Sequence, residues 1–194
     1  MRTILFVLIG ILIIGIISII FINSQNNTPA ATPSQTPTTI PESQVLGKET
    51  VEIPNVSTAT ITTSKGEIII ELFPEAAPNT VKNFAEKAEN NYYNDLTFHR
   101  IEDWVVQGGD PVGNGTGGGS MPTELNNNPF IKGSVGVARS GNIEISNDSQ
   151  FFITKTEAPW LDQQYTNFGQ ATEESMDVVE SLSIGDKILS ISVK

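Results

Sequence analysis

The sequence predicts a mainly β domain in which an antiparallel sheet closes on itself and two α-helices cover its ends, preceded by one N-terminal transmembrane helix. Three observations support this class. Short β-rich runs recur between turn residues, helical periodicity is confined to two segments, and an uncharged apolar stretch opens the chain. We therefore divide the chain into a membrane anchor (1–23), a disordered linker (24–57) and one folded domain (58–194).

The stretch from Ile4 to Ile22 carries no charged residue and is interrupted only by Gly10, Gly15 and Ser18. As a helix with a rise of about 1.5 Å per residue it would cover roughly 28 Å, close to the ~30 Å hydrocarbon thickness of a bilayer. We therefore predict an uncleaved single-span anchor.

A cleaved secretory signal peptide is the alternative for this stretch. Such peptides have a shorter apolar region that ends at small residues, whereas residues 22–27 read INSQNN, and no cysteine is present for a lipid anchor. Arg2 and the amino terminus are the nearby positive charges, so the positive-inside bias places the N-terminus in the cytoplasm. We expect a single-pass cell-membrane protein with its folded domain outside the cytoplasm.

The linker is poor in large apolar side chains and rich in Thr, Ser, Gln, Asn and Pro. Such a composition cannot offset the entropy of ordering, so we predict an extended tether. Its prolines do not form P-x-x-P pairs, which favours a spacer over a proline-rich docking motif.

The folded domain opens with β-rich runs at 58–63 and 67–73 around turn residues 64–66, which predicts a hairpin. Pro78 then suits the first turn of a helix, where its missing N–H has no helical partner to lose. Four apolar residues recur on one face of that helix: Val81, Phe84, Ala85 and Ala88.

A second helix is predicted at 173–183, because acidic residues open its first turn and apolar residues recur on one side. Those apolar residues are Met176, Val179 and Leu182. The last strand is predicted at 188–193, where alternation indicates one buried face. We expect that face to consist of Leu189, Ile191 and Val193.

The composition excludes several function classes. The chain has no cysteine, which rules out thiol catalysis, a disulfide framework and a cysteine-ligated metal. Its formal net charge is −11, and an acidic surface repels phosphate backbones, so we expect no nucleic-acid partner. The absence of disulfides is compatible with a location outside the cytoplasm without establishing it.

The most informative motifs are residues 98–100 (FHR) and 107–110 (QGGD), echoed downstream by residues 149–153 (SQFFI). They place one permanent cation, Arg100, among aromatic and amide side chains with no nucleophile beside it. Arginine stays charged at any working pH and offers a rigid fork of donors. The pattern therefore indicates stabilisation of a polarising group rather than proton transfer or a covalent step.

These motifs, with residues 159–162 (PWLD) and 166–169 (TNFG), resemble the cyclophilin family of peptidyl-prolyl isomerases from about Ala59 to Val193. The resemblance implies an eight-stranded β-barrel with two capping helices. It also implies catalysis of X-Pro rotation without a cofactor or metal, proline-containing polypeptides as clients and cyclosporin as a possible ligand. We expect the protein to act as a monomer.

The resemblance also assigns the site. Arg100 is the catalytic donor and Gln107 orients it, while the backbone at Ala138 and Arg139 pairs with the bound peptide. The expected substrate-binding residues are Phe98, Trp104, Val105, Ala138, Arg139, Gln150, Phe152, Trp160, Leu161 and Tyr165. Because neighbouring strand residues point to opposite faces, only one of Phe151 and Phe152 can face the substrate.

Three departures from the family pattern affect ligand preference. The segment from Arg100 to Gln107 is one residue shorter than usual and carries Trp104 where a Phe is common. Tyr165 replaces a frequent groove histidine, and residues 140–148 differ from the usual turn. These changes keep open a proline-segment binding or chaperone module with little turnover.

Other patterns have simpler interpretations. His99 is the only histidine, and we interpret it as a hydrogen-bonded structural residue rather than a base or a zinc ligand. A serine hydrolase is disfavoured because no G-x-S-x-G motif occurs. The glycines at 113, 115 and 118 formally match G-x-G-x-x-G, but no helix is predicted after them, so we interpret the segment as a loop that borders the groove.

Overall fold

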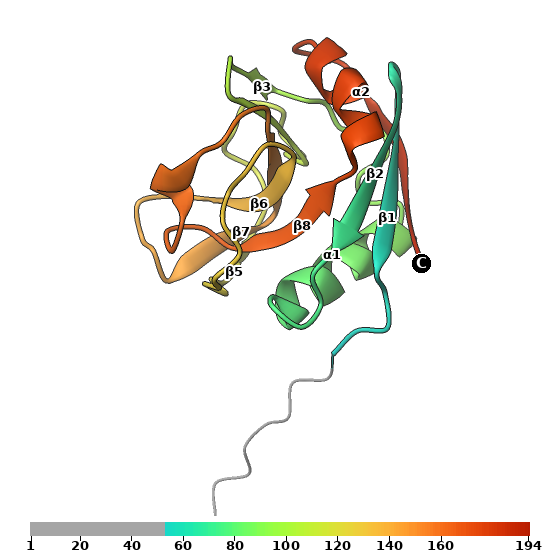
Figure 1. The fold of residues 1–194 in the computed structure, drawn as a ribbon. Helices are drawn as coiled ribbons and strands as arrows, with labels where there is room; N and C mark the ends of the chain where they lie inside the picture. The colour runs from blue at the N-terminus through green and yellow to red at the C-terminus, as the bar shows by residue number, and fades with distance from the viewer. Residues whose placement is uncertain (1–52) are drawn as a thin grey trace, which may run out of the picture. The chain divides into compact units, whose positions relative to one another are not determined.

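The computed structural model of this chain describes residues 53–194 (Figure 1). The predicted anchor and the linker up to residue 52 lie outside the described residues, and both stay predictions. Within residues 53–194, no helix is both long enough and apolar enough to cross a membrane.

The predicted N-terminal hairpin is confirmed as β1 (Thr58–Thr63) and β2 (Gly66–Leu72). The two strands pair antiparallel, with Ile61 opposite Ile68. Alternate residues of β2 are buried, as expected for a strand that packs one face on a core. The hairpin therefore forms one wall of the main core.

The described residues contain nine strands in one sheet, in the order β3-β4-β7-β6-β8-β2-β1-β9, with β5 paired to β7 beside this path. Every pairing is antiparallel. The strands not yet given are β3 (Arg100–Ile101), β4 (Val105–Gly108), β5 (Ser120–Pro122), β6 (Ser134–Arg139), β7 (Ile145–Thr154), β8 (Asn167–Ala171) and β9 (Ile188–Val193).

The sheet is curled rather than a closed eight-stranded barrel, and the prediction is corrected in this respect (Figure 1). No ladder between the described strands joins the edge strands β3 and β9. They approach through one isolated bridge between Thr97 and Lys187, just before each strand begins. Strand β3 is only two residues long, which leaves too few backbone groups for a continuous seam.

Two helices lie at opposite ends of the curled sheet (Figure 1). Helix α1 (Pro78–Glu89) begins at Pro78 and buries the four apolar residues predicted to share a face. The second predicted helix is shorter than 173–183: a 3₁₀ turn, η2 (Glu173–Ser175), leads into α2 (Met176–Ser181). A second 3₁₀ turn, η1 (Pro159–Leu161), precedes β8.

Helix α1 takes its N-terminal cap from a distant segment. Its own N-cap residue, Ala77, has no side-chain oxygen, and the Glu124 carboxylate instead accepts hydrogen bonds from the backbone N–H groups of Asn79 (3.0 Å) and Thr80 (2.7 Å). A carboxylate satisfies free amides at a helix N-terminus and complements the helix dipole. This contact fixes α1 to the chain that follows β5.

The burial of β9 differs from the predicted alternation. Ile188 and Ile191 are buried, whereas Leu189 is 48 % exposed. The β1–β9 register shifts at Thr62 and Thr63, so Ile188 pairs with Thr63 and Ser190 with Thr62, and Leu189 is left without a partner. A bulge of this kind interrupts the period-two alternation that the sequence pattern assumed.

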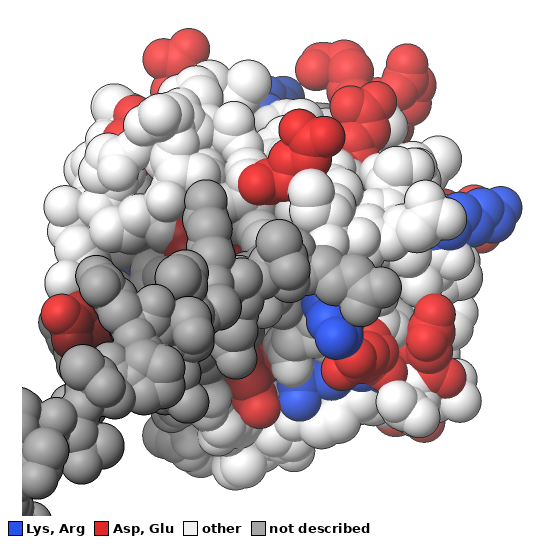
Figure 2. Space-filling model, turned by 90° about the horizontal axis from the view of Figure 1, so that it is seen from below, with Lys and Arg blue, Asp and Glu red and all other residues white. Residues whose placement is uncertain are grey.

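The surface of the domain is acidic, as the composition predicts. On the face seen in Figure 2, acidic side chains outnumber basic ones, in agreement with the net charge of −11 for the whole chain. Such a surface is electrostatically unfavourable for polyanions.

Candidate functional site

Strands β4 and β7 carry apolar side chains on both faces of the sheet. On one face Val106 and Phe151 join the main core, together with Phe84 of α1. On the other face Val105 and Phe152 form a separate buried cluster. The expectation that only one of Phe151 and Phe152 can face a ligand is therefore met, because neighbouring strand residues point to opposite sides.

The second cluster lies beneath a row of cross-strand neighbours. Arg100 of β3 is opposite Gln107 of β4, Gln107 is opposite Phe152 of β7, and Phe152 is opposite Gly136 of β6. Adjacent strands are roughly 4.8 Å apart, so this register brings a cation, an amide and an aromatic ring side by side. The site is thus a product of strand pairing.

The residue opposite Phe152 has to be glycine, because aromatic rings occupy the space that a side chain at position 136 would need. A Cβ atom at this position would collide with the rings of Phe152 and Phe130. The Phe152 ring occupies that space and stacks on Phe130, with 5.7 Å between ring centroids. The absence of a side chain on β6 thus sets the position of the aromatic floor.

A hollow of about 90 Å³ opens above Phe152. Its remaining lining residues are Arg100, Trp104, Gln107, Ala138, Arg139, Leu161 and Tyr165. The lining thus combines the apolar side chains of Phe152 and Leu161 with the guanidinium of Arg100. This arrangement can hold a small apolar ring next to a hydrogen-bond donor.

Arg139 and Tyr165 form part of the wall of this hollow. The Arg139 guanidinium lies 4.5 Å from the centre of the Tyr165 ring and donates from Nε to the carbonyl of Gln164 (2.7 Å). Tyr165 in turn meets Phe152 edge-on at 5.7 Å. These contacts fix the Arg139 side chain against the protein, which supports a structural role for it.

Arg100 is connected to the interior by a chain of amide hydrogen bonds. Its Nη1 donates to Gln107 Oε1 (3.1 Å), and Gln107 Nε2 donates to Gln150 Oε1 (2.9 Å). Gln150 Nε2 then donates to the carbonyls of Gly115 (3.2 Å) and Gly117 (2.8 Å). Each amide has its orientation fixed by the next partner, so the Arg100 head group rests on a defined support.

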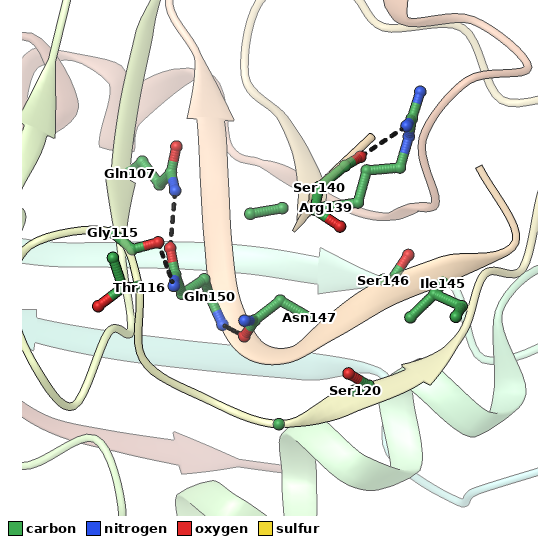
Figure 3. A pocket seen from close by; sticks show the side chains of 12 residues that line it. Gln107, Gly115, Thr116, Ser120, Arg139, Ser140, Ile145, Ser146, Asn147 and Gln150 are labelled. Atoms are coloured by element: carbon green, nitrogen blue, oxygen red, sulfur yellow. Dashed lines mark hydrogen bonds between the residues drawn. The ribbon is translucent and has the colours of Figure 1, made fainter. Parts of the chain in front are cut away.

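A larger hollow of about 320 Å³ adjoins this chain (Figure 3). It shares Gln107, Ala138 and Arg139 with the aromatic hollow, and the glycine-containing loop borders it as predicted. The register of β6 and β7 shifts between Val137 and Arg139, so Ala138 has no direct partner on β7. The backbone at Ala138 and Arg139 thus borders both hollows and is not fully paired with β7.

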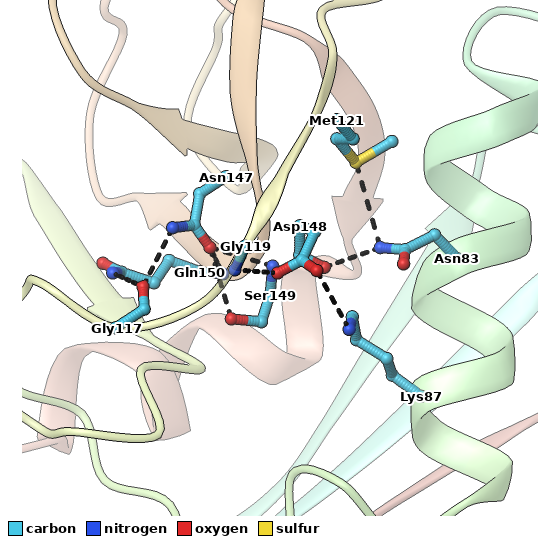
Figure 4. Close-up of polar contacts among 9 residues, drawn as sticks. All are labelled: Asn83, Lys87, Gly117, Gly119, Met121, Asn147, Asp148, Ser149 and Gln150. Atoms are coloured by element: carbon cyan, nitrogen blue, oxygen red, sulfur yellow. Dashed lines mark hydrogen bonds and ion pairs between the residues drawn. The ribbon is translucent and has the colours of Figure 1, made fainter.

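Asn147 and Asp148 of β7 contact the loop on which the amide chain ends (Figure 4). Asn147 Oδ1 accepts from the backbone N–H groups of Ser149 (2.9 Å) and Gln150 (2.8 Å), and its Nδ2 donates to the Gly117 carbonyl (3.0 Å). Asp148 accepts from Gly119 N–H (2.7 Å) and pairs with Lys87 of α1 at 3.4 Å. The loop at 115–119 is thereby attached to both β7 and α1.

A buried carboxylate organises the same loop. Asp110 is 1 % exposed, and it accepts hydrogen bonds from four backbone N–H groups of the loop. The donors are Val112 (2.9 Å), Asn114 (2.8 Å), Gly115 (2.5 Å) and Gly117 (3.0 Å). Burial opposes ionisation, but these amides outweigh it and hold the pKa of Asp110 below its usual value. A Cβ at Gly117 would collide with this carboxylate.

His99 is structural, but it differs from the prediction in its hydrogen bonding. Both ring nitrogens are buried and find no hydrogen-bond partner within residues 53–194. Burial lowers the pKa of His99, and the negative charge of Asp110 only partly offsets this effect. The imidazole is therefore neutral at pH 7, and it does not line the aromatic hollow.

Most predicted site residues meet at the two hollows, with three exceptions. Phe98 has no exposed surface and belongs to the main core, so its assignment as substrate-binding is corrected. Val105 is fully buried and supports the floor from below. Trp160 is 58 % exposed and lies outside both linings, where it meets Trp104 edge-on at 5.6 Å.

Two groups of residues were not predicted from the sequence. Asn147 and Asp148 support the loop through contacts that a linear pattern cannot reveal. Glu102 contacts Arg100 directly, and the sequence carries no clear signal for this contact because Glu102 lies in the turn after β3. Within residues 53–194, no cluster of three or more His, Asp or Glu side chains could hold a metal ion.

Comparison with known proteins agrees with this geometry. The family model of the cyclophilin type peptidyl-prolyl cis-trans isomerases matches residues 58–191. A peptidyl-prolyl cis-trans isomerase of Synechococcus elongatus is 43 % identical over 139 residues, which cover 70 % of this chain and 94 % of the relative. One from Helicobacter pylori is 40 % identical over 146 residues, covering 72 % of this chain and 89 % of the relative.

A solved structure has the same fold. The cyclophilin type peptidyl-prolyl cis-trans isomerase of Cryptosporidium parvum, crystallised in the presence of the dipeptide Ala-Pro, superposes with a TM-score of 0.65 at 28 % identity. The match covers 71 % of this chain and 98 % of that chain.

The single histidine provides a direct test of the burial of His99. Because its pKa is lowered in the fold, the unfolded chain binds a proton near pH 6.5 while the folded chain resists it. The free energy of unfolding should therefore be highest above pH 6.5 and decline as the pH falls from 7 to 5. Chemical denaturation across this range would measure the decline, and His99→Gln should flatten it. An imidazole that titrates at or above pH 6.5 by NMR would contradict the prediction.

Replacing the buried carboxylate should weaken the loop. In Asp110→Asn the amide nitrogen cannot accept the N–H groups of Asn114 and Gly115, so the free energy of unfolding at pH 7 should fall by about 1–3 kcal/mol. Amide hydrogen exchange at those two residues should accelerate. The difference from the parent should begin to shrink as the pH falls below about 4, where Asp110 of the unfolded parent binds a proton, and should be lost once the pH is below the lowered pKa of the folded state. Asp103→Asn, at an exposed carboxylate, is the control and should change stability by less than about 0.5 kcal/mol.

Proposed function

This chain belongs to the cyclophilin-type peptidyl-prolyl cis-trans isomerases, and on that basis we propose that it accelerates X-Pro rotation by a non-covalent mechanism in which Arg100 is the catalytic donor. The observation that carries the mechanism is the cross-strand row in which Arg100 and Phe152 flank Gln107. The row supplies a fixed cation beside an apolar hollow. A non-covalent acceleration of X-Pro rotation can use this combination of groups.

The chemistry begins with amide resonance. Partial double-bond character raises a barrier of about 18–20 kcal/mol to rotation, and the uncatalysed process takes tens to hundreds of seconds. In the twisted transition state the nitrogen regains its lone pair and becomes a hydrogen-bond acceptor. A donor aimed at that nitrogen binds the transition state better than the planar ground state, and this difference accelerates the reaction.

Each part of the site has a role in this scheme. The hollow above Phe152 receives the proline ring, Gln107 orients the guanidinium, and Arg100 approaches the twisted nitrogen. The backbone at Ala138, which has no direct partner on β7, pairs with the bound peptide. Lowering the barrier by about 5 kcal/mol would accelerate rotation by between three and four powers of ten. A fixed donor and a positioned ring can together supply this amount.

We further propose that the enzyme is tethered to the cell membrane through residues 4–22 and works outside the cytoplasm as a monomer. Its clients would be proline-containing polypeptides that fold there. The acidic surface disfavours nucleic acid as a partner. A cyclosporin-type ligand would use the same groove and the exposed Trp160.

Substitution of Arg100 tests the mechanism. Arg100→Ala should lower kcat/KM for a short proline peptide by about 10²- to 10³-fold, because it removes the donor that acts in the transition state. Arg100→Lys should recover little, since an ammonium lacks the planar fork that Gln107 orients. Two-dimensional NMR exchange measures both rates. Lys82→Ala, at an exposed cation of α1, serves as the control and should match the parent.

The outcomes separate two functions. An Arg100→Ala variant as fast as the parent would contradict the mechanism. Saturable peptide binding by the parent without faster exchange would instead favour the proline-segment binding module, which the changes at Trp104 and Tyr165 left open.

Membrane attachment can be tested separately. The full chain produced in a bacterium should sediment with membranes, and protease added to spheroplasts should digest the folded domain. A variant without residues 4–22 should be released into the soluble fraction. This orientation follows from Arg2 and the amino terminus on the cytoplasmic side. A domain protected from external protease, or a full chain that stays soluble, would overturn the proposed location.

A further inference from the structure

The guanidinium of Arg100 is held by a second side chain in addition to Gln107. Its Nε donates to Glu102 Oε1 at 2.8 Å, while Nη1 donates to Gln107 at 3.1 Å. The two partners therefore contact different edges of one planar group. Two hydrogen bonds on different edges restrain both the position and the plane of the fork.

The second oxygen of Glu102 has its own partner. Oε2 accepts from the indole Nε1 of Trp104 at 2.9 Å, and the Trp104 ring lies 5.4 Å from the central carbon of the Arg100 guanidinium. One carboxylate thus connects the candidate catalytic donor with a wall of the proline hollow. The three side chains form a closed set in which each contacts the other two.

The short β3–β4 connection explains this arrangement. Only Asp103 and Trp104 lie between Glu102 and Val105, whose backbones bond to each other (2.9 Å from Glu102 N–H to Val105 C=O). Glu102 directly follows β3, and this tight turn places its carboxylate beside the Arg100 guanidinium. This connection is the segment that is one residue shorter than the family pattern.

The connection is also fixed from the neighbouring strand. The backbone N–H of Lys155, just after β7, donates to the Trp104 carbonyl at 2.7 Å. Its Nζ donates to the Glu102 carbonyl at 3.0 Å. These bonds hold the backbone of the turn, so the Glu102 side chain starts from a defined position. A carboxylate on a fixed backbone can orient its partner.

One nitrogen of the Arg100 guanidinium, Nη2, is not engaged by the described part of the protein. Among residues 53–194, no group accepts a hydrogen bond from Nη2, and Arg100 lines the hollow above Phe152. Glu102 takes the one N–H of Nε and leaves both N–H groups of Nη2 available. The hydrogen bond from Arg100 also lowers the pKa of Glu102, so the carboxylate is ionised at neutral pH.

We propose that Glu102 is a positioning residue for the isomerisation, which holds Arg100 and Trp104 in the geometry that receives the substrate. This inference rests on the proposed role of Arg100. The pair is close to half exposed, with side-chain exposures of 41 % for Arg100 and 47 % for Glu102. Solvent therefore screens its charge, and it contributes little to stability. Its effect lies in fixing a catalytic orientation.

The test compares Glu102→Ala with Glu102→Gln in the full-length chain. The alanine variant loses both hydrogen bonds, and its turnover at saturating peptide should fall by about three- to five-fold. Its peptide dissociation constant should stay within about two-fold of the parent, because the hollow still binds the ring. The glutamine variant keeps an oxygen for Arg100 Nε and should recover most of the turnover.

NMR provides a readout that does not depend on catalysis. In the parent, the Arg100 Nε–H should exchange slowly with water, and it should exchange faster in Glu102→Ala. Glu102→Gln should restore the slow Arg100 signal. It should leave the Trp104 indole signal altered, because one amide oxygen cannot occupy both positions. A restored Arg100 signal together with an altered Trp104 signal would not arise from a general loss of stability.

Asp103→Ala and Asp103→Asn are the matched controls. Asp103 is the next residue in the same turn, is exposed, and makes no side-chain hydrogen bond or ion pair within residues 53–194. Its removal changes the local charge by the same amount, and turnover should stay at the parent value. An equal fall in the Asp103 variants would show a field effect and overturn the positioning role.

The remaining outcomes distinguish this inference from the proposed mechanism. If Arg100→Ala is slow while Glu102→Ala matches the parent, the positioning role is wrong and the mechanism stands. If Arg100→Ala matches the parent, the mechanism itself fails. If Glu102→Ala does not fold, Glu102→Gln tests the inference through its NMR signals and its turnover. A Trp104 indole signal and a turnover that both equal those of the parent would then overturn the inference.

Discussion

The register of four strands is the constraint on which the site depends. Arg100, Gln107, Phe152 and Gly136 are consecutive cross-strand neighbours, so no loop has to place the cation beside the aromatic floor. A slip of one residue in any of these pairings would turn the affected side chains to the opposite face of the sheet. The same period-two geometry separates Phe151 from Phe152, so β7 serves the core and the hollow at once.

Polar contacts give this row its rigidity. The amide chain from Gln107 through Gln150 ends on carbonyls of the glycine-containing loop, and Asp110 fixes that loop by accepting four of its amides. Asn147 and Asp148 attach the same loop to β7 and α1. A donor that must meet a transient acceptor benefits from such a support, because little reorganisation is left for the moment of reaction.

Local patterns predicted the regular elements well where only neighbouring residues decide them. The first hairpin and α1 follow from β-rich runs, turn residues and a helical face, and both are confirmed. The predictions were wrong where distant pairing intervenes. Leu189 is exposed because a bulge in the β1–β9 ladder shifts the alternation of buried and exposed residues. The predicted barrel is not closed, because β3 is too short to form a continuous ladder with β9.

The order of residues alone establishes which chemistry is available to this protein: the permanent cation of Arg100, the amides and aromatic residues of two motifs, and no thiol or nucleophilic motif. It could not determine which aromatic residues reach the site. Phe98 lies two residues before Arg100 in the chain yet belongs to the main core, whereas Phe152 reaches the site from β7 through strand pairing. It also did not reveal the contact of Glu102 with Arg100, because the conformation of the turn and its attachment to Lys155 set that distance. The fold settles these points, because they depend on strand pairing and on the attachment of the β3–β4 turn to Lys155, which join segments far apart in sequence.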